Sequence, residues 1–364
     1  MGDAPTENPG TLEVPVPNVG DLDRARLTDM LRDSGALSAG QAVERVVTGP
    51  RMRAGAMGAV HPMTLEYSAG VQLPTALVYK RTRPDLKFDA LEVRFYRELA
   101  RELPAGIAPR CLAARHDEKL GQYFLLLEDL GQTHQCLLGR ELPPIGPERV
   151  GQAVDALATL HAARFEGQLL GFGERANDPA ATTRRSLPWL REHYPRVRRR
   201  LGERLQERED ALYRRYLELR SPELVRRLEA RRGFALLHGD PHVGNVLFPR
   251  EGTAEGAMLI DWGIYRMGPC TWDLAFHLLW TDPACWSRET SAGLLRRYHQ
   301  GLLERGVADY PYARCEDDFR HALLDGLRTP LSQLAASHVP DDVAFGAHTA
   351  VMVLIDAWDR AELL

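Results

Sequence analysis

Two short polar segments contain the residue types and spacing that could do chemistry in this chain. In the first, His238-Gly239-Asp240 is followed five residues later by Asn245, between apolar flanks of strand-like composition. The glycines and the proline in this segment oppose a helix, so it reads as a loop. The second is an apolar run that ends at Asp261. Two loops at the ends of paired strands could therefore present Asp240, Asn245 and Asp261 to one point.

This trio suits phosphoryl transfer. That reaction needs little covalent help from the protein, but it needs Mg²⁺ at the phosphate oxygens and a carboxylate that orients and deprotonates the attacking hydroxyl. Mg²⁺ takes oxygen ligands and few protein carboxylates. Asp261 and the amide oxygen of Asn245 could supply such ligands, which leaves Asp240 as the base.

Two other interpretations of the first segment are open. His238 and His242 have the His-x-x-x-His spacing that binds zinc when both lie on one helix face. The intervening Gly239 and Pro241 argue against that helix. The segment could also be only a well-made turn.

The pattern His-Gly-Asp-x-x-x-x-Asn followed by Ile-Asp-Trp-Gly resembles the aminoglycoside phosphotransferase and choline kinase-like superfamily. Gly268 and the run Trp272-Asp273-Leu274-Ala275 also match that family, and the resemblance covers most of the chain. It implies a bilobal, protein-kinase-like α+β fold. We expect a small β-rich N-lobe at residues 1–130 and a larger α-helical C-lobe at residues 131–364.

The resemblance also implies roles for individual residues. Asp240 would be the catalytic base, Asn245 and Asp261 would bind Mg²⁺, and His238 would be a structural histidine that braces the loop. The phosphoryl donor would be ATP or GTP.

A kinase-like N-lobe also needs a lysine for the α- and β-phosphates and a glutamate that positions it. Lys80 ends a strand pattern and is one of only three lysines among 46 basic residues, although an exposed strand-end lysine is the plain alternative. Its partner would come from a helix predicted at residues 88–103. Glu92–Tyr96 is similar to the Glu-x-x-Phe-Tyr pattern of an ecdysteroid-kinase-like branch, so Glu92 is preferred and Glu98 is held in reserve.

Two further nucleotide contacts are predicted from position. Backbone N–H groups near Gly55 and Gly58 could cradle phosphates, although a plain glycine-rich hairpin explains these residues equally well. Glu128, Asp129 and Leu130 stand where the interlobe hinge of the family would bind the adenine edge through main-chain groups.

The acceptor is expected to be a small molecule. Only ten residues separate Asp261 from Trp272, too few for the loop on which a protein kinase binds its peptide. Resemblance and composition favour an antibiotic or similar natural product, whose phosphorylation would confer resistance; a metabolic kinase of choline, a sugar or an amino alcohol, and a pseudokinase-like nucleotide-binding module, are alternatives. Acidic residues near the C-terminus could line a pocket for a cationic acceptor, or form only an acidic surface: Asp282, Asp317, Asp318, Asp325, Asp341, Asp342, Asp356 and Asp359.

Composition sets the broad class of protein. The 364 residues, with 44% apolar and 26% charged side chains, are ordinary for a globular protein, and the net charge of -4 gives no reason to expect nucleic acid. Five cysteines without CxxC spacing indicate reduced thiols. With no signal peptide or membrane span expected, the prediction is a cytoplasmic monomer or homodimer.

Periodicity and turn residues predict the order of the elements. A helix is expected after residue 20, starting near Asp21 or Asp23 with Leu27, Met30 and Leu31 on its inner face. The arginine-rich stretch at residues 184–232 is read as solvated helix faces with interleaved acids. The remaining expectations are strands at 43–47, 57–67, 73–80, 110–116 and 122–127, a helix at 150–165, and three or four helices between 287 and 361.

Overall fold

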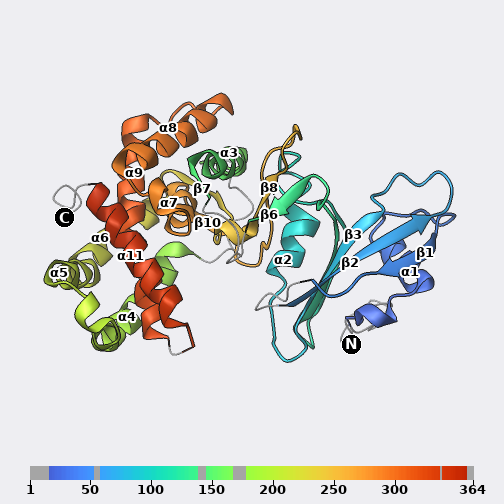
Figure 1. Ribbon diagram of the computed structural model, residues 1–364, viewed down its shortest axis with the longest axis horizontal. Coiled ribbons are helices and arrows are strands. Elements are labelled where there is room, and N and C mark those ends of the chain that lie inside the picture. Colours follow the sequence, from blue (N-terminus) through green and yellow to red (C-terminus); the bar gives the residue numbers. More distant parts are fainter. Residues whose placement is uncertain (1–15, 53–57, 138–144, 167–177, 337, 359–364) are drawn as a thin grey trace, which may run out of the picture. The chain divides into compact units, whose positions relative to one another are not determined.

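The computed structural model describes residues 16–52, 58–137, 145–166, 178–336 and 338–358, and the chain forms two compact units (Figure 1). The first unit comprises Met1–Glu98 and Arg110–Asp129, and the second comprises Leu99–Pro109 and Leu130–Leu364. The sequence had suggested one boundary after residue 130. Leu99–Pro109 instead belongs to the second unit, because Ile107 is buried and its carbonyl accepts the Leu259 N–H.

The first unit is an antiparallel sheet with helical segments. Its sheet has the strand order β1-β2-β3-β5-β4. Both the order of the elements and the strand positions confirm the sequence prediction to within a few residues. The elements are η1 (Val19–Asp21), α1 (Arg24–Asp33), β1 (Val43–Thr48), β2 (Gly58–Tyr67), β3 (Ala76–Thr82), α2 (Leu91–Arg94), η2 (Phe95–Leu99), β4 (Cys111–Asp117) and β5 (Gln122–Glu128).

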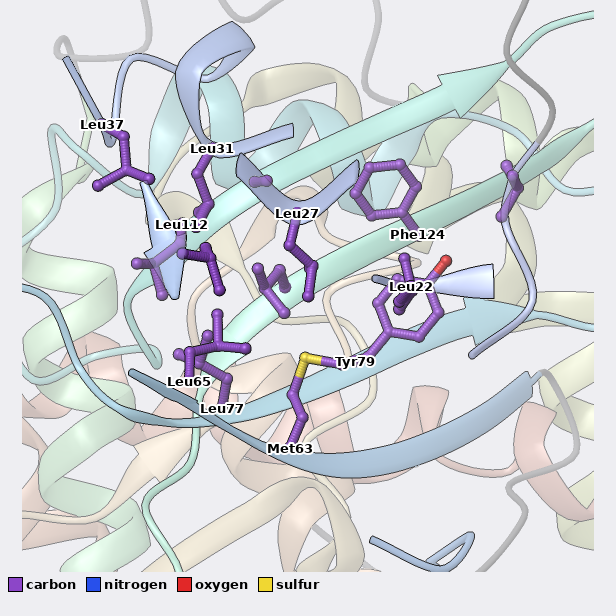
Figure 2. Close-up of a cluster of buried hydrophobic side chains, with 14 residues drawn as sticks. Leu22, Leu27, Leu31, Leu37, Met63, Leu65, Leu77, Tyr79, Leu112 and Phe124 are labelled. Atoms are coloured by element: carbon purple, nitrogen blue, oxygen red, sulfur yellow. The ribbon is translucent and has the colours of Figure 1, made fainter. Parts of the chain in front are cut away.

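Helix α1 begins at a side-chain cap and covers one face of the sheet. The Asp23 carboxylate accepts the Arg26 N–H at 2.8 Å, which satisfies a backbone donor that the first turn leaves free. Leu27 and Leu31, four residues apart, are fully buried. Figure 2 shows both side chains directed at apolar residues of the strands, among them Leu77 and Phe124.

The pleat of the sheet separates this apolar core from the charged residues of the first unit. On β3, Leu77 and Tyr79 belong to the cluster under α1, so Lys80, the residue after Tyr79, points to the opposite face. On β5, Phe124 belongs to the same cluster, and Tyr123 points away from it toward α2. Strand alternation therefore places Lys80 and Tyr123 on the same side as α2.

The helix predicted at residues 88–103 is much shorter in the structure. Phe88 is not helical, because its N–H donates to the Gly121 carbonyl at 2.7 Å and its ring meets Tyr123 edge-on. The α-helix starts at Leu91 and becomes a π-helical turn at Phe95. It ends at Leu99, where the chain passes into the second unit.

The second unit is mainly helical, as the sequence predicted. It also contains two small sheets, β10-β7 and β6-β8-β9. Its elements are β6 (His134–Cys136), α3 (Pro147–Ala163), α4 (Pro179–Leu201), η3 (Gly202–Arg204), α5 (Glu207–Arg215), η4 (Tyr216–Arg220), α6 (Ser221–Ala230), β7 (Phe234–Leu237), η5 (Val243–Asn245), β8 (Val246–Pro249), β9 (Met258–Leu259), β10 (Arg266–Pro269), α7 (Thr271–Leu279), η6 (Pro283–Cys285), α8 (Arg288–Glu304), α9 (Tyr312–Asp325), α10 (Arg328–Ala335) and α11 (Asp341–Ala357).

The helices of the second unit pack against one another in pairs. Helix α3 packs on α8, α7 on α9, and α10 on both α4 and α11. Arg200 of α4 donates to the carbonyls of Gln333, Leu334 and Ala336, and so caps the end of α10. None of the helices in the described ranges combines the length and apolarity needed to cross a membrane.

The arginine-rich stretch forms ion pairs with nearby acids, which agrees with the interpretation as solvated helix faces. Asp210 accepts from both Arg198 and Arg214, at 2.8 and 2.6 Å. Arg227 of α6 reaches Asp317 and Asp318 of α9. These pairs are partly exposed and each stabilises the fold only slightly.

Shortening Leu31 to alanine is expected to destabilise the first unit. The fully buried side chain would leave a cavity against the sheet, at a cost of about 2–5 kcal/mol. Calorimetric unfolding should therefore show a transition at lower temperature. The exposed Asp29 of the same helix provides the control, and Asp29→Ala should leave the transition nearly unchanged. Equal effects of the two substitutions would contradict this account of the core.

Candidate active site

The loop that carries Asp240 is shaped by its own backbone. It follows β7, and its turns are closed by the His242 N–H on the Asp240 carbonyl and the Asn245 N–H on the His242 carbonyl, both at 2.8 Å. Gly239 has a φ of 89°, and a Cβ there would lie 2.3 Å from the Ile264 carbonyl oxygen. Only glycine fits this position, for both backbone conformation and space.

Asn245 connects the Asp240 loop to the strand that precedes Asp261. Its side-chain amide donates to the Asp240 carbonyl at 2.9 Å, and its own carbonyl accepts the Ile260 N–H at 3.0 Å. The strands that pair here are β8 and β9, which flank Asn245 and Asp261, whereas β7 pairs with β10. The expected pairing of strands beside the two loops is therefore found between β8 and β9, and the three side chains lie on connected loops.

Asp261 has a φ of 67°, an uncommon conformation for a residue with a side chain. The neighbouring Trp262 is fully buried, and its indole N–H donates to the Leu259 carbonyl at 3.1 Å. This anchor holds the turn, so the strain at Asp261 is maintained by its surroundings. Such strain concentrates at functional positions.

His238 is a buried brace between the two loops. Its Nε2–H donates to the Ile260 carbonyl at 2.9 Å, and its Nδ1 accepts the Asp240 N–H at 3.3 Å. Burial lowers the pKa of His238, which favours the neutral ring that these bonds require.

The zinc alternative does not fit this geometry. Both ring nitrogens of His238 are bonded to main chain, and Nδ1 of His242 accepts the Gly244 N–H at 3.0 Å. In the part of the chain that the structure describes, no group of three or more His, Cys, Asp or Glu side chains could hold a metal ion.

Asp273 of α7 holds the start of the loop in place. Its carboxylate accepts the His238 N–H at 2.6 Å and the Gly239 N–H at 3.1 Å, and Nε2 of His161 lies 3.3 Å away. Burial alone would raise the pKa of Asp273, but the hydrogen bond from His161 and the charges of nearby basic groups keep it below its usual value.

The sequence revealed only part of this anchor. Asp273 stood in a recognisable motif, although no positioning role was inferred for it. His161 looked like any residue on the buried face of an amphipathic helix.

The carboxylates around Asp240 repel one another. Burial and then the charges of Asp261 and Asp273 raise the pKa of Asp240 to about 7, against the opposing charge of Arg266. His242 Nε2 lies 3.8 Å from Asp240 Oδ2. A bound divalent cation would relieve this repulsion.

The donor set beside Asp240 suits Mg²⁺. Asp261 and Asn245 offer oxygen donors, and the Asn245 amide nitrogen is already used by the Asp240 carbonyl, so its Oδ1 is left for a cation. Mg²⁺ usually takes only one or two protein carboxylates and completes its shell with water and phosphate oxygens. The two oxygen ligands from Asp261 and Asn245 are therefore sufficient for a Mg²⁺ site.

In the first unit, Lys80 and Glu92 form a close ion pair. Lys80 Nζ lies 2.7 Å from both carboxylate oxygens of Glu92, which is almost fully buried. The Tyr123 hydroxyl donates to Glu92 Oε2 at 2.6 Å. Glu98, the reserve candidate, is exposed. Sequence reasoning missed Tyr123, because nothing in the chain connects it to Glu92 before the sheet is formed.

The two weaker nucleotide predictions find less support in the geometry. Gly55 lies outside the described residues. A Cβ on Gly58 would lie 2.2 Å from the Arg81 carbonyl oxygen, so the close approach of β2 and β3 by itself accounts for this glycine. Among the residues expected to bind the adenine edge, the Glu128 N–H donates to the Arg110 carbonyl, and the Leu130 carbonyl accepts the N–H groups of Thr133 and His134.

Most of the acidic residues proposed for an acceptor pocket have structural partners. Asp341 pairs with Arg200, Asp282 caps η6, and Asp317 and Asp318 pair with Arg227. Asp356 lies 3.8 Å from Arg208, and Asp342 is exposed in the first turn of α11. Asp325 is buried and accepts the Tyr216 hydroxyl at 2.7 Å, whereas Asp359 lies outside the described residues. The argument for a cationic acceptor therefore loses much of its basis.

The fold resembles that of several solved kinases. A proposed aminoglycoside phosphotransferase from Ralstonia eutropha is 13% identical with a TM-score of 0.53, over 92% of this chain and 97% of that one. An amicoumacin kinase, solved in complex with AMP-PNP, Ca²⁺ and Ami, is 14% identical with a TM-score of 0.51, over 86% of this chain and 88% of that one. A choline/ethanolamine kinase family protein from Mesorhizobium loti is 16% identical with a TM-score of 0.50, over 85% and 88%. The chain thus has a protein-kinase-like α+β fold.

The sequence itself identifies the family. Residues 73–314, well over half of the chain, match the phosphotransferase enzyme family, and the chain belongs to that family. This confirms the resemblance to the aminoglycoside phosphotransferases and choline kinase-like proteins. No curated protein sequence matches the chain.

Replacing Asp273 with asparagine is expected to loosen the Asp240 loop. The amide would keep one acceptor oxygen but would turn an NH₂ group toward a backbone donor, leaving a buried N–H unsatisfied. Hydrogen–deuterium exchange of the peptide at residues 236–245 should become faster. Asp155→Asn, at an exposed ion pair with Arg297, is the matched control and should leave this peptide protected. Unchanged exchange in Asp273→Asn would contradict the anchoring role.

Proposed function

We propose that this chain is a Mg²⁺-dependent kinase that transfers the γ-phosphoryl of ATP or GTP to a hydroxyl of a small molecule. The observation that carries the proposal is the arrangement of Asp240, Asn245 and Asp261 on two loops that Asn245 and His238 connect. Membership of a phosphotransferase family supports the reaction class. The amicoumacin kinase of similar fold binds the ATP analogue AMP-PNP, which supports a nucleotide donor.

In this proposal, Asp240 is the catalytic base. Its carboxylate is half-exposed at the end of a rigid turn, so an acceptor hydroxyl can reach it. Asp240 would orient that hydroxyl and take its proton as the oxygen attacks the γ-phosphorus. His238 and Asp273 would act indirectly, by fixing the backbone on which Asp240 stands.

Asp261 and the Oδ1 of Asn245 would hold the metal. Mg²⁺, when bound, neutralises charge on the phosphate oxygens in the transition state. The backbone strain at Asp261 and the hydrogen bond that orients the Asn245 amide are consistent with a preformed site.

Lys80 would bind the α- and β-phosphates, with Glu92 holding its ammonium group in place. The near-complete burial of Glu92 and its bond from Tyr123 support this positioning role. We place the adenine edge against the main chain of Glu128 and Leu130, through the Leu130 N–H, because its carbonyl is already used in a turn.

We propose that the acceptor is an antibiotic or similar hydroxylated natural product. The amicoumacin kinase of similar fold supports this substrate class. A metabolic acceptor such as choline is the second candidate, supported by the similar choline/ethanolamine kinase family protein. A binding module without catalysis is less favoured, since Lys80, Asp240, Asn245 and Asp261 are all in place. ATP and Mg²⁺ are available in the cytoplasm, where we expect the reaction.

The first test is phosphoryl transfer itself, with Asp240→Asn as the blank. Wild-type protein with Mg²⁺ and γ-labelled ATP or GTP should add one phosphate to a member of a panel of hydroxylated antibiotics and metabolites. Loss of the base should reduce this rate by at least about 100-fold. AMP-PNP binding should persist, because Asp240 is not assigned to the nucleotide. Full turnover by Asp240→Asn would remove it from this role.

A second test concerns the metal. Asp261→Ala removes a carboxylate ligand, so the affinity for AMP-PNP should no longer increase when Mg²⁺ is titrated in calorimetry. Asp342→Ala, at an exposed carboxylate in the first turn of α11, is the control and should retain the wild-type response. A normal Mg²⁺ response in Asp261→Ala would refute the ligand assignment.

A further inference from the structure

Arg266 lies next to the start of the loop that carries Asp240. It is the first residue of β10 and is opposite Leu237, the residue that directly precedes His238. Strands β7 and β10 lie side by side beside α7 in Figure 1. The next residue, Met267, is buried, so the alternation of the strand directs Arg266 to the other face.

The guanidinium of Arg266 packs directly against the backbone of the loop. A Cβ on Gly239 would lie 3.1 Å from Arg266 Nη1. The centroid of the Trp272 ring lies 5.8 Å from Arg266 Cζ. The guanidinium of Arg266 is therefore close both to the residue before Asp240 and to a largely buried aromatic ring.

The Arg266 guanidinium interacts electrostatically with Asp273, Arg328, Asp325 and Asp240. Three of the four are carboxylates. The charges of Asp261 and Asp273 in turn act on Asp240, and the charge of Arg266 opposes their repulsion. Arginine suits this place, because a guanidinium stays charged even where burial lowers its pKa.

A second layer fixes the far side of this arrangement. Asp325, at the end of α9, is buried and accepts the Tyr216 hydroxyl at 2.7 Å. Tyr216 opens a π-helical turn and is itself buried. Asp325, one of the expected acceptor-pocket residues, is therefore a buried charge that interacts electrostatically with Arg266.

We propose that Arg266 is a positioning residue, which supports the Gly239 turn and offsets the repulsion among the carboxylates so that Asp240 is held toward the acceptor. The inference rests on the proposed function of Asp240 as base. It adds a residue that lies outside the His-Gly-Asp and Ile-Asp-Trp-Gly motifs. Arg266 acts through Asp240 and needs no contact with nucleotide or acceptor.

A double-mutant cycle with Asp240 tests the electrostatic link without any acceptor. Thermal unfolding of wild type, Arg266→Gln, Asp240→Asn and the double variant would be compared in the same buffer near pH 8.5. Arg266→Gln should lower the midpoint in wild type and lower it by less than half as much in Asp240→Asn. Equal losses in both backgrounds would overturn the proposal.

Kinetics test the positioning role with the acceptor that wild type phosphorylates. Arg266→Gln should lower kcat by about 10- to 100-fold, since small displacements of a reacting group cost rates of this order, and should leave the KM for ATP within about twofold. Arg266→Lys should recover part of kcat. Arg297→Gln, which breaks an exposed ion pair with Asp155, is the matched control and should keep wild-type kcat. A wild-type kcat in Arg266→Gln, or no recovery by lysine, would overturn the proposal.

The two experiments separate this inference from the proposed function. If wild type phosphorylates nothing in the panel, the proposed function fails, and the unfolding cycle still decides whether Arg266 is coupled to Asp240. If wild type is active and the cycle shows no coupling, only the role of Arg266 fails.

Discussion

The position of the loop that carries Asp240 depends on one buried carboxylate. Asp273 accepts two consecutive backbone N–H groups, those of His238 and Gly239, and is approached by His161. A carboxylate in this environment would be costly without such donors, and the two N–H groups would be costly without the carboxylate. Because each satisfies the other, the loop has one favoured position. Further hydrogen bonds then connect the rest of the site to this position: the Asp240 N–H donates to His238, the Asn245 side chain donates to the Asp240 carbonyl, and the Ile260 N–H donates to the Asn245 carbonyl.

In the first unit, the pleat of the sheet determines where the charged residues lie. The same strand, β3, gives Tyr79 to the apolar cluster under α1 and Lys80 to the opposite face. The buried Glu92 is acceptable there because Lys80 and the Tyr123 hydroxyl both bond to it. Removing one partner would leave a buried charge without compensation, so Lys80, Glu92 and Tyr123 depend on one another. An apolar core on one face thus positions a charged pair on the other.

In the second unit, charged residues are arranged differently on the surface and around Asp240. On the surface, arginines and acids pair across helices, and several acids that could have served an acceptor are engaged in this way. Near Asp240, carboxylates are concentrated beyond what Arg266 alone can balance. A site with this excess of negative charge is suited to a divalent cation with a nucleotide phosphate. Recognition of the acceptor must therefore depend on more than a general acidic field.

The sequence by itself determined the order of the elements, because glycine, proline and strand periodicity act locally, and it predicted the residues to which we assign the reaction. It identified Asp240, Asn245 and Asp261 as one group and indicated Lys80 through its rarity. Tertiary structure alone decided that Tyr123 bonds to Glu92, that the carboxylate of Asp273 joins its helix to the catalytic loop, and that Arg266 lies against Gly239. These contacts join residues 27 to 35 positions apart, and local sequence carries no record of such pairings. They exist because the sheet pleat and helix packing bring the groups together, and because buried polar groups must find partners.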